Sequence, residues 1–333
     1  PLLPRLWMRA RKDLVAQWEA ECHRSYLYAG KRKGANVAAW KQAAAAELAS
    51  TALTAIGYAQ ALLNLVKAFD RVPYMLIVRE AIALGYPLRV LRLSIATYLI
   101  KRVIRIRNVV SQTVVAFRGI TAGTGFATME MRVILIRVMD RATLMYKMIK
   151  PTVFVDDIAA DMCGPEKQIV RNLGGFIDVV ADFFKTNRLE LSSKKSVCTA
   201  TTKKLGNRLV DKWKKHGIKF CERVKALGVG LAAGCRRNME VLTKRLRTFA
   251  ARTAKFRRLR KAGVDTARIV RTGLRGMTYG QSTTGVSDSF LHRQRVTVAS
   301  MATPGETTCG QNLDLALIIA DGSATGRADP AYD

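Results

Sequence analysis

The sequence predicts an α+β fold, in which helices pack on one face of a small antiparallel sheet. Helix-like and strand-like stretches alternate irregularly along the chain, and the expected strand pairings include hairpins. Hydrophobic residues make up 49% of the 333 residues. That content allows a sizeable core in one large or two to three ordinary domains.

The first part of the chain is predicted to be mainly helical, with one buried strand and one hairpin. Helices are expected at residues 7–18, 37–55, 73–84 and 88–100, the third of them opened by a proline. The short apolar run at 61–66 is typical of a buried strand. Strands at 103–106 and 113–117 are expected to pair around Arg107-Asn108.

The second part begins with a glycine-rich turn at 119–125 and a helix at 127–148 that is apolar on most faces, and therefore buried. The elements expected after it are a hairpin at 152–160, a helix at 166–185, strands at 197–200 and 224–229, and basic helices at 236–279. The last fifty residues are rich in Gly, Ala, Thr and Ser, with one apolar patch at 313–320. They are expected to be partly disordered or a truncated module.

Two adjacent aspartates, Asp156 and Asp157, lie inside the apolar run Thr152–Ala160. Burying one carboxylate in such a run is costly, and two neighbouring carboxylates also repel each other. A bound cation would remove both penalties, and oxygen ligands on a tight hairpin suit Mg²⁺ held against a phosphate. The alternative is a plain turn between two short strands, because aspartate favours turns.

The chain is strongly basic, with 56 Lys+Arg against 25 Asp+Glu and a formal net charge of +31. This charge is far above what solubility requires and indicates a polyanionic partner, most often nucleic acid. An anionic membrane is the rival partner, but no apolar run approaches the roughly 18 residues of a spanning helix.

The six cysteines form no CxxC pair, and only three histidines accompany them. A structural zinc site is therefore not expected, and free thiols in a reducing compartment are. The N-terminus does not have the pattern of a secretory signal, and it lacks an initiator Met, as a fragment of a longer reading frame would. We expect an intracellular protein that is nuclear or nucleus-associated.

The basic stretch from Arg236 to Tyr279 contains no acid between Val241 and Val264. A merely solvated face is the alternative explanation, but like charges at helical spacing repel, so contact with phosphates is favoured. The candidate residues for the nucleic-acid backbone are Lys244, Arg245, Arg247, Arg252, Lys255, Arg257, Arg258, Arg260 and Lys261.

Five short segments, taken in order, resemble motifs of one known family. They are NLVKAFDRVP at 64–73, RGITAGT at 118–124, FVDD at 154–157, LELSSKKS at 189–196 and KALGV at 225–229. The chain resembles a reverse transcriptase of the non-LTR (LINE-like) retrotransposon group, in a truncated or degenerate copy. In that family the corresponding motifs are D-x-x-K-A-F-D-x-V, the G-x-x-Q-G turn, (Y/F)-x-D-D, G-L-x-x-N-x-x-K and the L-G primer-grip hairpin.

The resemblance implies a right-hand polymerase, with an antiparallel palm, fingers and a helical thumb. It implies N-terminal helices or partial fingers at 1–59, palm and fingers at 60–230, a basic thumb-like region at 231–285 and a poorly defined tail at 286–333. The implied activity is RNA-directed DNA synthesis, in which dNTPs are added to a primer 3′-OH with two Mg²⁺ ions, or Mn²⁺ in their place. The implied partners are an RNA template, a DNA primer and dNTPs.

The resemblance also assigns roles to single residues of the catalytic centre. Asp156 and Asp157 become metal ligands, and Asn64 occupies the position of the first metal aspartate. Phe69 becomes the bulky residue under the sugar that disfavours a 2′-OH, with a core phenylalanine as the alternative. Lys195 is expected near the incoming triphosphate, with a surface lysine as the alternative.

Four further positions follow from the same resemblance. Gly119 and Gly123 would let the backbone approach the nucleotide, and Leu227 and Gly228 would form the primer grip.

Departures from the family pattern bear on activity. Asn64 is neutral where the family has an aspartate, and Asp70 would lie about 20 Å further along an extended strand, too far to substitute. Ala122 replaces the glutamine of the second motif, and Arg188 replaces a glycine. We therefore expect impaired activity in a decayed copy.

One alternative is a catalytically inactive nucleic-acid-binding remnant. Another alternative is a basic scaffold without polymerase ancestry, which a structure separating residue 64 from Asp156 would favour.

Overall fold

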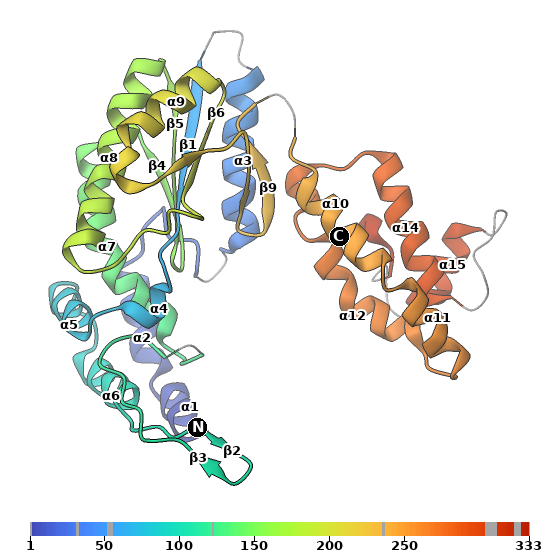
Figure 1. Ribbon diagram of the computed structural model, residues 1–333, viewed down its shortest axis with the longest axis horizontal. Coiled ribbons are helices and arrows are strands. Elements are labelled where there is room, and N and C mark those ends of the chain that lie inside the picture. Colours follow the sequence, from blue (N-terminus) through green and yellow to red (C-terminus); the bar gives the residue numbers. More distant parts are fainter. Residues whose placement is uncertain are drawn as a thin grey trace. The chain divides into compact units, whose positions relative to one another are not determined.

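The computed structural model describes residues 2–30, 33–51, 56–121, 123–234, 237–303, 312–322 and 328–332. The chain divides into two compact units (Figure 1). Unit 1 comprises Pro1–Ala38 and Leu48–Glu222, and unit 2 comprises Ala39–Glu47 and Arg223–Asp333. The boundary at 222/223 precedes the expected end of the palm-like region at 230.

The N-terminal segment is helical, but the single helix expected at 7–18 is wrong. Helices α1 (Leu2–Ala10) and α2 (Lys12–Glu21) are separated at Arg11, whose φ of −113° and ψ of 10° are not helical. The indole Nε1 of Trp18 donates to the Leu84 carbonyl at 2.9 Å, which ties α2 to the end of the helix α5 (Tyr74–Ala83). Helix α3 (Ala35–Thr51) follows, and the expected residues 52–55 lie outside the described residues.

A five-stranded sheet forms the centre of unit 1, in the order β4-β5-β1-β6-β7. Its strands are β1 (Gly57–Leu63), β4 (Lys150–Phe154), β5 (Asp157–Gly164), β6 (Val197–Ala200) and β7 (Lys219–Phe220). The first three neighbouring pairs are antiparallel, and β7 joins β6 in parallel, so the sheet is mixed. The fold class is α+β, as predicted, but the expected purely antiparallel sheet is wrong, because β7 pairs with β6 in parallel.

Strand β1 differs from the strand expected at 61–66, because its pairing extends in the other direction. It pairs with β5 from Gly57↔Gly164 to Leu63↔Ile158. Beyond Leu63 the chain leaves the sheet, and Leu65 makes only an isolated bridge to Leu191. The apolar character of Leu65 therefore reflects core packing and not continued pairing with β5.

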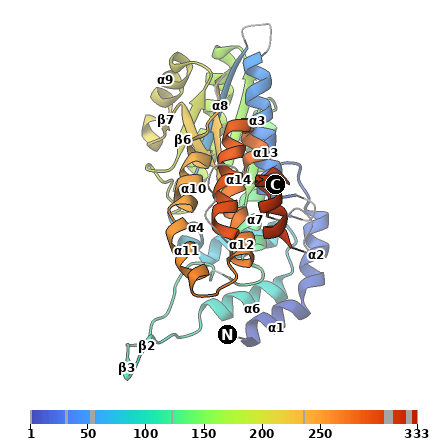
Figure 2. The same cartoon turned by 90° about the vertical axis from the view of Figure 1, so that its right-hand side faces the viewer.

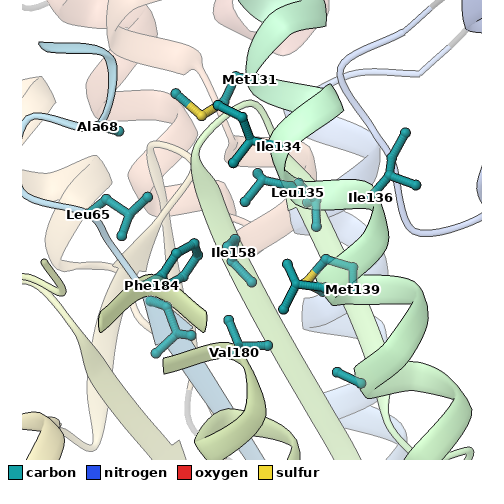
Figure 3. Close-up of a cluster of buried hydrophobic side chains, with 14 of the residues drawn as sticks. Leu65, Ala68, Met131, Ile134, Leu135, Ile136, Met139, Ile158, Val180 and Phe184 are labelled. Atoms are coloured by element: carbon teal, nitrogen blue, oxygen red, sulfur yellow. The ribbon is translucent and has the colours of Figure 1, made fainter. Parts of the chain in front are cut away.

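The core of unit 1 lies between the sheet and the helices α7 (Ala127–Met145), α8 (Glu166–Thr186) and α9 (Lys203–Lys212). Helix α7 is buried on most faces, as predicted. Figure 3 shows Leu65 and Ala68 in one cluster with Ile158 of β5 and Phe184 of α8. Burying a side chain such as Leu65, Ile158 or Phe184 stabilises the fold by about 1.5–3 kcal/mol, so the segment that follows β1 is firmly anchored.

Three helices and a hairpin connect β1 with α7. The helices are α4 (Ala68–Arg71), α5 (Tyr74–Ala83) and α6 (Leu88–Tyr98), of which the last two confirm the predicted helices. Strands β2 (Arg105–Ile106) and β3 (Val109–Val110) pair around Arg107-Asn108. The second strand expected at 113–117 is wrong, because a two-residue turn places Val109 opposite Ile106.

Unit 2 combines a short hairpin with a helical bundle. The strand expected at 224–229 is instead the hairpin of β8 (Arg223–Ala226) and β9 (Val229–Ala232). The bundle contains α10 (Glu240–Ala250), α11 (Thr253–Lys261), α12 (Thr266–Thr278), α13 (Gln281–Thr284), α14 (Asp288–Ala302) and α15 (Leu313–Asp321). The short helices η1 (Lys214–His216) and η2 (Pro330–Tyr332) belong to units 1 and 2 respectively.

The stretch from 286 onward, expected to be poorly defined, contains α14 and α15. Val298 of α14 and Leu317 of α15 are buried in a second core together with Leu242, Val270 and Leu274. Within the described parts of both units, no helix is long and apolar enough to cross a membrane.

Candidate metal centre and nucleic-acid interface

The two aspartates lie at the turn of the β4–β5 hairpin. Phe154 and Asp157 form the last pair of the ladder, so Val155 and Asp156 make the turn. Val155 has a φ of +61°, a left-handed conformation that costs an L-residue roughly 1–2 kcal/mol and is unusual for a β-branched side chain. Both aspartates are half-buried. A strained turn of this kind persists only where its surroundings fix it, and such turns cluster at functional sites.

Asn64 meets this turn because β1 ends beside the start of β5. Its Nδ2 donates to Oδ1 of Asp157 at 3.0 Å. Its carbonyl oxygen accepts from the Ser192 backbone N–H at 2.8 Å, and its own N–H donates to Oγ of Ser196 at 3.2 Å. The sheet therefore brings together two positions that are 93 residues apart in the chain and holds the Asn64 backbone on both sides.

The electrostatics of the turn favour a cation. Burial raises the pKa of Asp157, and the charge of Asp156 raises it further, while the Asn64 hydrogen bond and the Lys195 charge lower it. No cation of the described chain forms an ion pair with either aspartate. The negative charge of the two carboxylates is therefore not compensated by an ion pair within the described chain.

The donor set fits a hard divalent ion, but with one neutral member. Carboxylate oxygens and an amide carbonyl oxygen are ligands that Mg²⁺ accepts. The described residues contain no cluster of three or more His, Cys, Asp or Glu that could hold a metal. Asn64 is not among these residue types, although its Nδ2 lies 3.0 Å from Oδ1 of Asp157.

The glycine-rich turn is tied to α4. Gly119 has a φ of +99°, and a Cβ there would lie 2.7 Å from the Asp70 carbonyl oxygen. The Gly119 N–H donates to the Val72 carbonyl at 2.8 Å, and the Ile120 N–H donates to the Phe69 carbonyl at 2.7 Å. Gly119 is therefore required for packing against the first motif. Asp70 lies in α4, so the extended-strand spacing assumed from the sequence is wrong.

The remaining residues predicted to contact a nucleotide are Gly123, Phe69 and Lys195. Gly123 has a φ of +81° with open space at its Cβ position, whereas Ala122 lies outside the described residues. Phe69 is half-buried and packs against the core, which supports the alternative that it is a core phenylalanine. Lys195 is exposed, and its charge acts on Asp157. The roles of Phe69 and Lys195 toward a nucleotide stay predictions.

Arg188 occupies a backbone position suited to glycine. Its φ is +57°, directly after the end of α8, where a left-handed residue commonly stops a helix. The residue type departs from the motif, but the backbone keeps the conformation that a glycine would adopt most easily.

In unit 2, the Leu227-Gly228 turn is held by the basic helices. Tyr279 Oη donates to the Leu227 carbonyl at 3.1 Å, and an Arg245 guanidinium N–H donates to the Gly228 carbonyl at 2.7 Å. Both turn residues have positive φ, +49° for Leu227 and +81° for Gly228. The predicted primer-grip turn and the predicted phosphate-binding helices thus form one structure inside unit 2.

Next to this turn is a groove between α10 and α12 with a volume of about 380 Å³. Its lining residues include four cations and no acid: Lys225, Val241, Lys244, Arg245, Thr248, Phe249, Arg252, Gly273, Gly276 and Met277. A helix-interior glycine costs about 1 kcal/mol relative to alanine, so two on one face of α12 favour close approach of a ligand to the backbone. The groove has the composition of a phosphate-binding site.

Sequence reasoning identified three of these groove cations but missed Lys225 and the glycines. The spacing of Gly273 and Gly276, three residues apart in a basic amphipathic helix, is the signal that could have found them. Of the other predicted cations, Arg247, Lys255, Arg257, Arg258 and Lys261 are exposed. Arg260 differs, because its guanidinium donates to the Ser300 carbonyl at 3.1 Å and burial lowers its pKa, so packing accounts for it.

No family model matches the chain, and the curated proteins include no match to it. The geometry around Asn64 and Asp157 and the composition of the groove are therefore the observations on which a function can be argued.

Proposed function

We propose that unit 1 carries a nucleotidyl-transfer site of the reverse-transcriptase type, weakened by Asn64, and that unit 2 binds nucleic-acid phosphates. In this proposal the five-stranded sheet is the palm of a right-hand polymerase and unit 2 is its thumb. The observation that carries the proposal is the 3.0 Å contact between Asn64 of the first motif and Asp157 of the FVDD turn.

The reaction is the attack of a primer 3′-OH on the α-phosphorus of a dNTP, with an RNA template. A new P–O bond forms, the 3′-hydroxyl proton passes to solvent water, the bond from the α-phosphorus to the oxygen of the β-phosphate breaks, and pyrophosphate leaves with the electron pair. Divalent ions supply activation of the hydroxyl and neutralisation of the phosphates. Asp156, Asp157 and the amide oxygen of Asn64 would hold these ions.

Other residues of the site would orient the substrates. Lys195 contributes a positive charge beside Asp157, where a triphosphate bound to the metal would lie. Gly119 fixes the turn against α4. Lys244 and Arg252 of the groove would bind phosphates of the nucleic-acid backbone, an electrostatic contact that carries no sequence information.

A second candidate is a catalytically inactive nucleic-acid-binding remnant with the same fold. It is favoured by the neutral side chain at position 64, because a hard divalent ion is held less well by two carboxylates and an amide than by three carboxylates. The two candidates share unit 2 and differ only at the metal centre.

The test is primer extension by Asn64→Asp against the unmodified chain, with Mg²⁺, a primed RNA template and dNTPs. We expect the variant to be faster by at least about a thousandfold, which corresponds to roughly 4 kcal/mol of transition-state stabilisation. The Asn64→Asp/Asp156→Asn double variant is the control, and its activity should fall back. Equal rates for the single variant and the unmodified chain would contradict a metal role for position 64. No extension by Asn64→Asp, with nucleic-acid binding retained, would favour the remnant.

A further inference from the structure

A hairpin between α6 and the glycine-rich turn is exposed along its length. Residues 99–114 are all exposed, and in both views the hairpin extends beyond α6, away from the five-stranded sheet (Figure 1, Figure 2). The segment Leu99–Arg118, which contains β2 and β3, is called the arm below. A two-stranded ribbon has no core of its own and is marginally stable in water. Such a ribbon is therefore expected to bind a partner, because packing against the partner would stabilise it.

The arm has one apolar face near its tip. Ile106 pairs with Val109, and Ile104 lies two residues before Ile106, so all three share a face. Their exposed fractions are 62% for Ile104, 69% for Ile106 and 74% for Val109. Arg105 lies on the opposite face, and its Nε donates to the Arg107 carbonyl at the tip, at 3.1 Å.

The charge of the surrounding segment has a single sign. Residues 81–129 contain no acid. Their cations are Arg89, Arg92, Lys101, Arg102, Arg105, Arg107 and Arg118. Within the described chain, none of the arm's cations forms an ion pair. Pairing of two arms from two copies would therefore bring like charges together, whereas a polyanion would neutralise them.

The base of the arm is joined to the glycine-rich turn. Arg102 donates to Oγ1 of Thr121 at 2.9 Å, and its backbone pairs with Val114. Immediately after the arm, the Gly119 N–H donates to the Val72 carbonyl just beyond α4. The arm thus begins at the glycine-rich turn, which the sequence predicts to approach a nucleotide.

We propose that the arm binds a nucleic-acid strand, with its arginines on phosphates and its apolar face against sugars and bases. A lipid surface fits less well, because the tip that would enter it first carries Arg107 and Asn108. The proposal rests on the proposed function only in taking nucleic acid as the partner, and it requires no catalysis. Apolar contacts of this kind add affinity without depending on salt, whereas phosphate contacts release counterions.

The test measures binding of the full chain to single-stranded RNA and to an RNA–DNA duplex by fluorescence anisotropy over a range of salt. Arg105→Gln/Arg107→Gln should make the slope of log affinity against log salt shallower by about 1.8 on the duplex, at about 0.9 per phosphate contact, and weaken binding about tenfold. The matched control is Arg89→Gln/Arg92→Gln, which removes the same charge from exposed positions on α6 and should change binding less. Ile104→Ser/Val109→Ser should weaken binding without changing the slope.

Three results would overturn the proposal. The first is an equal effect of the arm pair and the α6 pair, and the second is unchanged RNA and duplex binding in both arm variants. The third is loss of binding to vesicles containing phosphatidylserine, or loss of a dimer in sedimentation, with RNA binding intact. Circular dichroism and thermal melting confirm that each variant is folded. Failure of Asn64→Asp to extend a primer leaves the arm result standing, so the two proposals fail separately.

Discussion

The two units place their charges in opposite ways. Among the carboxylates of unit 1, Glu130 and Asp161 are buried, and Asp157 is half-buried at the hairpin turn. In unit 2, cations line an open groove with no acid among its lining residues. The effect of each carboxylate in unit 1 depends on the position of that single group. The affinity of the groove for a polyanion depends on the sum of its positive charges.

The two parts of the proposed function should therefore respond differently to substitution. A metal centre of three oxygen ligands changes character when Asn64 replaces one carboxylate. A groove with four cations loses only a fraction of its affinity when one is removed. A chain of this kind can therefore lose catalysis through a single substitution and still bind nucleic acid.

Close packing of the glycine-rich turn in unit 1 should contribute strongly to stability. Gly119→Ala places a Cβ 2.7 Å from the Asp70 carbonyl oxygen at a φ of +99°, so it should reduce the free energy of unfolding by at least about 2 kcal/mol. Gly123→Ala is the matched control, because its φ is +81° but its Cβ meets nothing within 4 Å, and it should cost about 1 kcal/mol. Urea denaturation measures both, and equal losses would mean that backbone conformation alone explains Gly119.

The buried acids of unit 1 should make stability depend on pH. Burial raises the pKa of Glu130 to about 7 and that of Asp161 to about 7. The two carboxyl groups therefore keep their protons in the folded state at pH values where they have already ionised in the unfolded chain. The stability that the protonated groups contribute below about pH 4 is lost as pH rises through 7. Between about pH 5 and 7 each group should lower the free energy of unfolding by about 1.4 kcal/mol per pH unit.

Glu130→Gln should roughly halve this dependence, because the amide can still accept the hydrogen bond from Tyr98 Oη but does not titrate. Asp161→Asn should remove the other half, and urea denaturation across the pH range measures both variants. An unchanged pH slope in the two single variants would show that these carboxylates do not carry the effect.

Substitutions in the groove of unit 2 should have a smaller effect on the affinity for nucleic acid. Lys244→Gln/Arg252→Gln should make the slope of log affinity against log salt shallower by about 1.8 on duplex, and should weaken binding about tenfold. Arg268→Gln/Arg293→Gln removes the same charge from exposed positions of unit 2 outside the groove. If the two pairs weaken binding equally, the groove is not a site and the basic surface acts as a diffuse field.

The elements that the sequence predicted well are those fixed by local pattern. The FVDD hairpin follows from an apolar run broken by two aspartates, and β6 lies at the predicted residues 197–200. Helix α8, predicted at 166–185, ends at Thr186. In each case the signals that define the element lie within the element itself.

The parts that could not be predicted depend on partners that are distant in the chain. The pairing of β1 with β5 decides that the strand ends at Leu63, and only then does Asn64 meet Asp157. The groove needs α10 and α12 to pack so that Gly273 faces the cations of α10. The close approach of Gly119 to Asp70 is likewise a long-range contact that no local pattern encodes.

In the proposed function, positions 64, 156 and 157 form one metal centre, and titration with Mn²⁺ tests this arrangement without any catalysis. Calorimetry of the full chain should give at least about tenfold tighter Mn²⁺ binding for Asn64→Asp than for the unmodified chain, or about 1.4 kcal/mol. The added affinity should disappear in Asn64→Asp/Asp156→Asn. Equal Mn²⁺ affinity in the unmodified chain and in Asn64→Asp would contradict the account.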